Sequence, residues 1–283
     1  MKRNSYSEIL KILPEQSKDA IMSTLSILPQ NLREFLRDKF SLEDEKFLSD
    51  PVFEPMFSYK TDSNSFEELS GKLLERSFVN VLDKSTEYRF SKTMHPYEHQ
   101  IKSWKTLLNT NNSLVVSSGT GSGKTECFMI PIISDLVRQS KGSSNVLEGV
   151  QALFIYPLNA LIQNQKERFS EWTNPYEGKI RFCLYNGLLP TENPNHEQKK
   201  SLEEITDRQG LRLSPAPLLI TNTTMLEYML IRANDKQIID KSKGMLKYII
   251  LDEAHTYIGS QAAELSLLLK RVLDGFEVNS QDV

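Results

Sequence analysis

The sequence has few or none of the features that mark membrane, secreted or repeat proteins. Its two cysteines, Cys127 and Cys183, form neither a metal-binding spacing nor a disulfide framework. No apolar run approaches the roughly 20 residues that cross a bilayer, and the basic N-terminus has no signal-like apolar core. Internal repeats and low-complexity tracts are also missing. We therefore expect a protein of the reducing cytoplasm with no membrane partner.

The chain also has little net charge, formally −3 from 34 Lys and Arg against 37 Asp and Glu. Binding to nucleic acid would therefore depend on a local patch rather than on a global positive field. Hydrophobic residues make up 39% and charged residues 25%, which is typical of a globular protein. The 283 residues are enough for one large or two modest domains.

A change of pattern near residue 88 predicts two domains. Residues 1–88 place apolar side chains at three- and four-residue spacings, which predicts a helical accessory region. Its helices are expected at residues 17–28, 32–48 and 62–83, punctuated by Pro14, Pro29, Pro51 and Pro55. Asn64 or Ser65 is expected to cap the third helix, with Glu67 or Glu68 in its first turn.

Residues 89–283 alternate short apolar runs with helical patterns, which predicts an α/β fold with a mostly parallel sheet. Strands are expected at residues 114–117, 152–156, 180–185, 218–221 and 248–251. Helices are expected at residues 126–139, 159–172, 224–233 and 260–273. The polar segment 274–283 is expected to be a frayed tail.

The run SLVVSSGTGSGKT, residues 113–125, joins an expected strand to an expected helix through three glycines. Glycines let backbone N–H groups converge on an anion, and the helix start adds its positive dipole end. Lys124 would reach the β- and γ-phosphates, and the Thr125 hydroxyl would hold Mg²⁺. The pattern asks for Gly where Ser118 stands, and Ser is small enough for the turn. The alternative is a glycine-rich turn that only closes a βα unit. The candidate phosphate-binding residues are Ser118, Gly119, Thr120, Gly121, Ser122, Gly123, Lys124 and Thr125.

The second motif, YIILDEAH, covers residues 248–255 and ends an expected strand on two adjacent carboxylates. Asp252 would hold Mg²⁺, and Glu253 would orient and deprotonate the attacking water. His255 lies close enough in sequence to sense the γ-phosphate or a partner lobe. The alternative is that the acidic pair caps the following helix.

GTGSGKT and DEAH, in this order and spacing, resemble motifs I and II of the superfamily 2 helicases. Residues 156–161, YPLNAL, resemble the motif Ia that grips the nucleic-acid backbone, and Gly187 stands where motif Ib has its glycine turn. Residues 220–226, ITNTTML, resemble the later backbone-gripping motif, with Thr223 where Pro often stands. Residues 95–100, HPYEHQ, resemble the motif in which a glutamine, here Gln100, recognises adenine. The candidate nucleic-acid contacts are Pro157, Leu158, Asn159, Ala160, Gly187, Thr221, Asn222 and Thr224.

The residues of these motifs are similar to those of a bacterial branch of the superfamily, which contains the repair helicases of the MrfA and Hrq type and large antiphage helicases. The resemblance implies a RecA-like P-loop lobe at residues 89–283 that uses ATP and Mg²⁺ and acts on nucleic acid, with DNA favoured. It also implies a second RecA-like lobe, in cis or in trans, that supplies an arginine finger, and further repair or defence subunits as partners. The Ser-Ala-Thr motif of the family does not occur in this sequence, so we expect one lobe with weak turnover alone.

Plainer interpretations stay open for the lesser motifs. Gln100 could be a surface glutamine, and Pro157 could simply end a strand. The hydroxyls and amide of Thr221, Asn222 and Thr224 could be helix caps. Three basic residues beside the motifs are expected to be solvated charges: Lys102, Lys166 and Arg168. At the level of function, the alternatives to a helicase are a translocase that remodels duplex DNA without separating strands, and a nucleotide-binding interaction module with negligible turnover alone.

Overall fold

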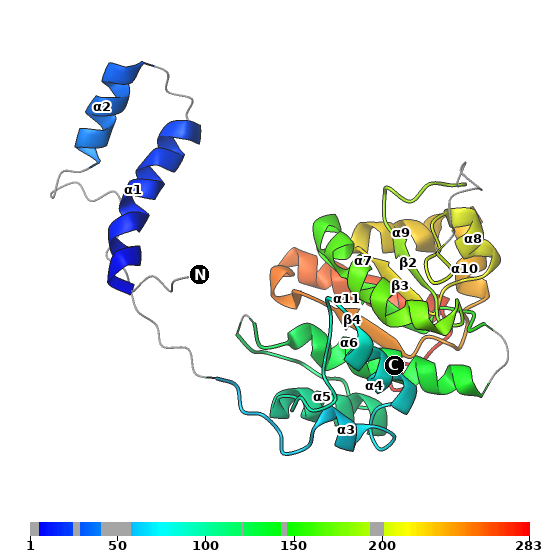
Figure 1. The fold of residues 1–283 in the computed structure, drawn as a ribbon. Helices are drawn as coiled ribbons and strands as arrows, with labels where there is room; N and C mark the ends of the chain where they lie inside the picture. Colours follow the sequence, from blue (N-terminus) through cyan, green and yellow to red (C-terminus); the bar gives the residue numbers. More distant parts are fainter. Residues whose placement is uncertain (1–5, 25–28, 41–57, 120, 143–145, 193–200) are drawn as a thin grey trace. The chain divides into compact units, whose positions relative to one another are not determined.

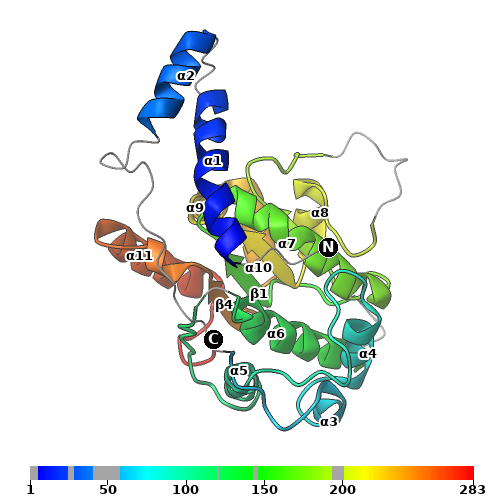
Figure 2. The same ribbon diagram turned by 60° about the vertical axis from the view of Figure 1, so that its left-hand side comes forward.

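The computed structural model describes residues 6–24, 29–40, 58–119, 121–142, 146–192 and 201–283. The chain divides into two compact units, Met1–Ser58 and Tyr59–Val283, which are drawn in Figure 1 and Figure 2 and are described separately below. No helix among these residues is both long and apolar enough to span a bilayer.

The described residues of the first unit form two helices, α1 (Tyr6–Thr24) and α2 (Gln30–Lys39). An ion pair between Arg37 and Asp19 links them. Pro14 lies inside α1, so the expectation that Pro14 precedes a helix is wrong, although Pro29 does stand immediately before α2. The remaining predicted helical positions, 25–28 and 41–48, lie outside the described residues, as do Pro51 and Pro55.

A four-stranded parallel sheet with the order β2-β3-β1-β4 forms the centre of the second unit. Its strands are β1 (Ala152–Ile155), β2 (Phe182–Tyr185), β3 (Leu218–Thr221) and β4 (Tyr248–Leu251). Because neighbouring strands are parallel and in register, all four carboxyl ends meet at one edge, as in other open α/β sheets. The α/β fold class predicted from the sequence is therefore confirmed.

Alternate residues of each strand face two separate apolar cores, one on each side of the sheet. Phe154 and Ile220 belong to one core, and Ile155 and Leu219 belong to the other. Helices α4 (Arg76–Lys84), α5 (Glu98–Asn109), α6 (Lys124–Lys141) and α7 (Asn159–Thr173) cover the first side. Helices α9 (Thr223–Ile231), α10 (Lys236–Asp240) and α11 (Ser260–Gly275) cover the second, so that the sheet is covered on both faces (Figure 1). This two-sided burial explains why the strands read as continuous apolar runs rather than as alternating patterns.

The helices of this unit are α3 (Phe66–Leu69), α4 (Arg76–Lys84), α5 (Glu98–Asn109), α6 (Lys124–Lys141), α7 (Asn159–Thr173), α8 (Arg208–Leu213), α9 (Thr223–Ile231), α10 (Lys236–Asp240) and α11 (Ser260–Gly275). Single turns of 3₁₀ helix lie at Asn174–Tyr176, Ala233–Asp235 and Ala254–Thr256. The expected helices after residue 120 all form, and their ends shift by a few residues at most.

The division of the structure lies at Ser58–Tyr59 and not near residue 88. Phe66, Leu74, Phe78 and Leu82 are at most 1% exposed, and they pack into the same core as the sheet. A helical pattern was therefore a poor guide to the boundary, because residues 59–88 bury their apolar face against the α/β unit itself.

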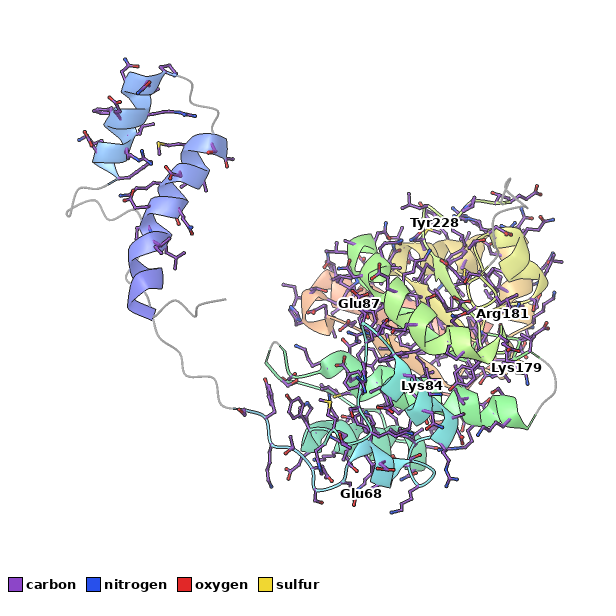
Figure 3. The ribbon with its side chains drawn as sticks, viewed as in Figure 1. Glu68, Lys84, Glu87, Lys179, Arg181 and Tyr228 are labelled. Carbon is purple, nitrogen blue, oxygen red and sulfur yellow. The ribbon has the colours of Figure 1, made fainter. Side chains whose placement is uncertain are left out.

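The single helix expected at residues 62–83 is instead two helices, α3 and α4. Gly71 lies between them with a φ of 77°, a conformation that interrupts a helix. The predicted cap is confirmed: Ser65 accepts from the Glu68 N–H, and Glu68 (labelled in Figure 3) accepts from the Ser65 N–H at 2.7 Å.

The strand expected at residues 114–117 does not form. The segment has no regular secondary structure and alternates half-buried with exposed residues, and Val115 is 91% exposed. A strand requires a hydrogen-bonded neighbour, and β4, whose only partner among the described strands is β1, does not pair with it.

The expectation of a frayed tail is also wrong at its start, because Phe276 is fully buried and its carbonyl accepts from the Gly244 N–H at 2.7 Å.

Candidate functional site

The candidate phosphate-binding loop of the sequence, residues 118–125, is called the cradle below, and its described residues lead into α6. Lys124 is the first residue of α6, and Gly123 before it lies in the left-handed region at a φ of 73°. Gly121 has a φ of 74°, and a side chain at Gly123 would collide with the amide of Gln100. Both positions therefore need glycine. The start of α6 supplies backbone N–H groups that have no partner within the helix, together with the positive end of the helix dipole, which suits an anion.

Side chains of the cradle contact one another. Lys124 Nζ donates to the Ser118 carbonyl at 3.1 Å, and Ser118 Oγ lies 2.6 Å from Ser122 Oγ. Ser122 is 1% exposed, whereas Lys124 and Thr125 are half-buried. Ser118, which replaces the glycine of the sequence pattern, thus makes a hydrogen bond that glycine could not. Thr120 lies outside the described residues.

Asp252 stands at the carboxyl end of β4, directly after its last residue, Leu251. Its N–H donates to the Ile155 carbonyl at 3.1 Å, which extends the β1–β4 ladder by one residue. Burial raises the pKa of Asp252 above its ordinary value; the N–H of Glu253 and the Lys124 ammonium oppose the rise, and the charge of Glu253 adds to it. The Lys124 ammonium is thus one of the charges that act on this carboxylate.

Glu253 adopts a left-handed backbone conformation with a φ of 50°. For a residue other than glycine this costs on the order of 1–3 kcal/mol, and such strain is concentrated at functional sites. The Glu253 N–H donates to Asp252 Oδ1 at 2.9 Å, and His255 Nδ1 lies 3.2 Å from Glu253 Oε2. The side chain of His255 is 78% exposed, which leaves it free to meet a ligand or a partner.

The capping alternative for the acidic pair does not hold in the structure. The turn Ala254–Thr256 follows Glu253 without any side-chain capping bond. Helix α11 begins later, at Ser260, and is preceded by Gly259. Because neither Asp252 nor Glu253 caps a helix, their placement at the sheet edge has no such structural explanation.

Gln100 is 6% exposed, so it is not a surface glutamine. Its Oε1 accepts from the Tyr97 N–H at 2.9 Å, and its Nε2 donates to the Gly123 carbonyl at 3.2 Å. The residue therefore ties α5 to the cradle. Contact with adenine stays a prediction.

The candidate nucleic-acid residues come together at the carboxyl edge of three adjacent strands. Residues 157–160 follow β1 and Gly187 follows β2, while Thr221 ends β3 and residues 222–224 follow it. Asn222 Nδ2 donates to Asn159 Oδ1 at 2.8 Å, which joins two of these loops directly. Pro157 is half-buried; the exposed members are Leu158, Asn159, Ala160, Gly187 and Thr224.

Two candidates in this set have structural roles. The Thr221 hydroxyl is buried and donates to the Tyr185 carbonyl at 2.7 Å, so it is engaged within the protein. Asn222 caps α9 by accepting from the Met225 N–H at 2.8 Å. The exposed Asn159 and Thr224 are therefore better placed than Thr221 to contact a phosphate.

An ion pair behind the cradle was not expected from the sequence. Arg168 of α7 lies 3.0 Å from Glu126 in the first turn of α6, with side chains 18% and 12% exposed. The guanidinium also lies over the Tyr88 ring, 4.8 Å from its centroid. Arg168 is thus not a solvated charge. A hint existed in the sequence, because Trp172 is one helical turn beyond Arg168 and shares its face.

The residues at this edge fit a magnesium–nucleotide complex. The cradle supplies N–H groups and Lys124 for phosphates, while Thr125 and Asp252 supply the oxygen ligands that Mg²⁺ prefers. No group of three or more His, Cys, Asp or Glu side chains that could hold a metal ion occurs among the described residues. A magnesium that relies on phosphate oxygens and water for its other ligands needs no such group.

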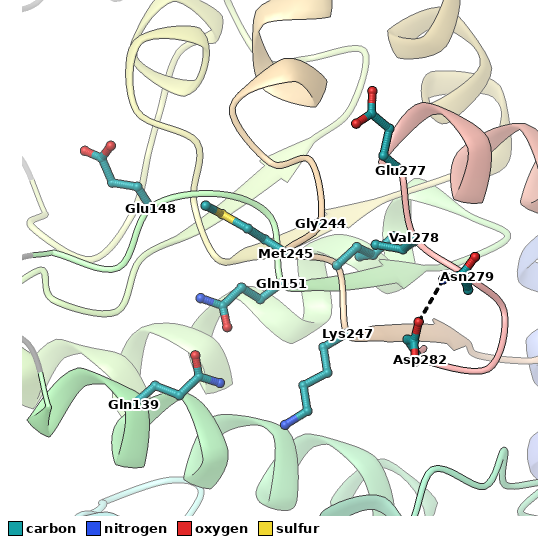
Figure 4. A pocket seen from close by; sticks show the side chains of 11 residues that line it. Gln139, Glu148, Gln151, Gly244, Met245, Lys247, Glu277, Val278, Asn279 and Asp282 are labelled. Atoms are coloured by element: carbon teal, nitrogen blue, oxygen red, sulfur yellow. Dashed lines mark hydrogen bonds between the residues drawn. The ribbon is translucent and has the colours of Figure 1, made fainter.

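A cavity also lies away from these residues. It measures about 570 Å³ and lies at the amino end of the strands, since Gln151 and Lys247 in its lining immediately precede β1 and β4 (Figure 4). Lys247 is paired with Asp135 at 2.8 Å. Because ligands of open α/β sheets bind at the carboxyl edge, this cavity is a poorer candidate for the functional site than the cradle.

The known proteins that are similar to this chain include the following three. The Druantia protein DruE of Escherichia coli is 24% identical over 90% of this chain and 20% of that protein. The ATP-dependent helicase hrq1 of Schizosaccharomyces pombe is 27% identical over 78% of this chain and 18% of that protein. The crystal structure of the DUF1998 helicase MrfA bound to DNA and AMPPNP superposes with a TM-score of 0.55 at 22% identity, over 78% of this chain and 26% of that one.

This likeness shows a RecA-like helicase fold, and the chain spans about a fifth of the length of these two curated relatives. The family model described as DEAD/DEAH box helicase matches residues 97–281. That span contains the cradle, the sheet and the Asp252–Glu253 pair, and the chain accordingly belongs to the DEAD/DEAH box helicase family.

Proposed function

We propose that this chain is the ATP-binding lobe of an ATP-dependent DNA helicase or translocase that works in the cytoplasm in DNA repair or phage defence. The observation that carries the proposal is the pairing of two features in one α/β unit: a glycine loop that enters α6 with Gly121 and Gly123 in the left-handed region, and an acidic pair at the carboxyl end of β4 that caps no helix. Family membership and the relatives named above support the same function.

In this proposal Lys124 binds the β- and γ-phosphates, and Thr125 and Asp252 hold Mg²⁺. Glu253 takes the proton of the attacking water, and His255 faces the γ-phosphate or a second lobe. The loops after β1, β2 and β3 grip the nucleic-acid backbone by phosphate contacts, which carry no sequence information. A second RecA-like lobe, in cis or in trans, supplies the arginine finger, which in related phosphoryl transfer contributes roughly 10³–10⁵ in turnover.

The test is nucleotide binding by the purified chain, measured by titration calorimetry with ATP and ADP in the presence of Mg²⁺. The unaltered chain is expected to bind, and Lys124→Ala is expected to lose most of its affinity. Lys102→Ala is the matched control, because this lysine is exposed on α5. Equal affinity of the Lys124→Ala and unaltered proteins would remove the phosphate-binding role.

A DNA-stimulated ATPase assay and a strand-displacement assay then distinguish the functions. Strand displacement supports a helicase, and stimulated turnover without displacement supports a duplex translocase. Nucleotide binding with no turnover, even when the second lobe is supplied, would leave only an interaction module.

A further inference from the structure

Helix α5 donates two side-chain hydrogen bonds to consecutive carbonyls of the cradle. His99 Nε2 lies 2.9 Å from the Ser122 carbonyl oxygen, and Gln100 Nε2 lies 3.2 Å from that of Gly123. A carbonyl oxygen only accepts, so Nε2 of His99 must carry the proton. The glutamine belongs to a motif already identified in the sequence, but nothing in that motif assigns a role to His99.

These two bonds fix the direction in which the cradle N–H groups point. The described part of the chain contains no cis peptide bond, and in a trans peptide the C=O and the next N–H point in opposite directions. Holding the Ser122 carbonyl toward α5 therefore turns the Gly123 N–H away from α5. Holding the Gly123 carbonyl in the same way turns the Lys124 N–H away from α5. Both N–H groups then belong to the start of α6, which is the anion-binding end of the helix.

We infer that His99 is a positioning residue for polyphosphate: it locks the Ser122–Gly123 peptide so that the cradle presents its N–H groups before a ligand arrives. The inference rests on the proposed nucleotide-binding function and assigns a further residue to it. Gly123 makes the lock necessary, since glycine is conformationally permissive and its peptide plane flips more easily than that of other residues.

The His99 ring is itself held in place by two aromatic neighbours. The Tyr97 ring stacks on it at 5.5 Å and 15°, and the Tyr59 ring meets it edge-on at 5.5 Å. Tyr59 also reaches the cradle, because its hydroxyl lies 2.8 Å from the position of a side-chain carbon on Gly119. A ring held by neighbours on its face and edge can keep one donor direction at little further entropic cost.

A further tie shows that α5 and α6 would stay together without His99. Trp104 is fully buried, and its Nε1 donates to the Glu126 carbonyl at 2.9 Å in the first turn of α6. Loss of the His99 bond is therefore expected to change the orientation of one peptide rather than the packing of the two helices.

The experiment measures binding of ATP and of inorganic tripolyphosphate to the full 283-residue chain by titration calorimetry, for the unaltered protein, His99→Ala and His99→Gln. His99→Ala is expected to lower the affinity for both ligands by the same factor, about tenfold, which corresponds to one lost hydrogen bond. His99→Gln retains a donor and is expected to recover part of the loss. His95→Ala is the matched control, because His95 contacts the carbonyl of Asp62 at 3.1 Å, away from the cradle.

The outcomes separate this inference from the proposed function. A loss for ATP without a loss for tripolyphosphate would overturn it, since His99 would then act on the base and not on the phosphates. Unchanged binding of both ligands in His99→Ala would overturn it as well, while the nucleotide-binding function would stand. Failure of the unaltered chain to bind either ligand would overturn both. Melting curves identify a variant that does not fold, in which case His99→Gln decides.

Discussion

Breaking the ion pair between Arg168 and Glu126 is expected to destabilise the α/β unit strongly. The pair is 3.0 Å long and only 18% and 12% exposed. At an effective dielectric constant of about 20, two unit charges at this distance attract by about 5–6 kcal/mol. Desolvation of the two ions offsets much of this attraction. The net contribution of the pair to the free energy of unfolding is therefore smaller than the free-energy cost of removing one partner and leaving the other charge unpaired.

Arg168→Met leaves Glu126 as an uncompensated carboxylate beside the cradle, which costs about 3 kcal/mol. It also removes the contact of the guanidinium with the Tyr88 ring, worth about 0.5–1 kcal/mol. For a unit of this size the melting temperature is expected to fall by about 10 °C. The double variant Arg168→Met with Glu126→Gln removes the stranded charge, so it is expected to be more stable than Arg168→Met alone.

The assay is urea unfolding, together with thermal melting, of the four proteins of a double-mutant cycle: the unaltered protein, Arg168→Met, Glu126→Gln and the double variant. Lys166→Met is the control, because Lys166 pairs with Glu204 at 2.9 Å from the same helix α7 but is 39% exposed. That change is expected to cost about 1 kcal/mol or less. Equal small losses for Arg168→Met and Lys166→Met, or a double variant less stable than Arg168→Met, would refute the reasoning.

Three further predictions concern the sheet edge. Asp252→Asn is expected to raise the melting temperature at pH 7 and to lose Mg²⁺-dependent nucleotide binding. Burial raises the pKa of Asp252 on folding, so the contribution of this carboxyl group to stability falls as pH rises through that pKa. Melting curves recorded at several pH values are expected to show that the variant has lost this pH dependence. Glu253→Gln, in an assembly that hydrolyses ATP, is expected to keep nucleotide binding and lose turnover by about 10²-fold or more in a steady-state ATPase assay. Asn159→Ala with Thr224→Ala is expected to weaken DNA binding equally for different sequences in fluorescence anisotropy, and loss confined to one sequence would point to base contacts instead.

The cradle and the acidic pair could be located from the sequence because their signals are local. Gly121 and Gly123 stand where the backbone has a positive φ, which few other residues tolerate. The apolar run before Asp252 predicted β4 with its correct bounds, because a strand covered on both faces consists of consecutive apolar residues. Neither inference needed information from distant parts of the chain.

The segment at residues 114–117 and the boundary near residue 88 were wrong for a common reason. Apolar residues in a short run show that a segment can form a strand, but pairing depends on which neighbour the sheet offers. In the same way, the helical pattern of residues 59–88 shows that an apolar face exists and not what covers it. Here the sheet's own core covers it, through Phe66 and Phe78.

The contacts that position the cradle lie beyond sequence patterns for a further reason. His99, Gln100 and Trp104 each donate to a backbone carbonyl, and every residue has a carbonyl, so the acceptor leaves no mark in the sequence. A salt bridge at least needs a residue of opposite charge, which is why Arg168 could have been paired in principle. A donor that orients a peptide plane can be assigned only once the fold places it there. It follows that residues preparing a phosphate cradle are best sought among buried donors of the adjoining helix, even where the motif itself is unmistakable.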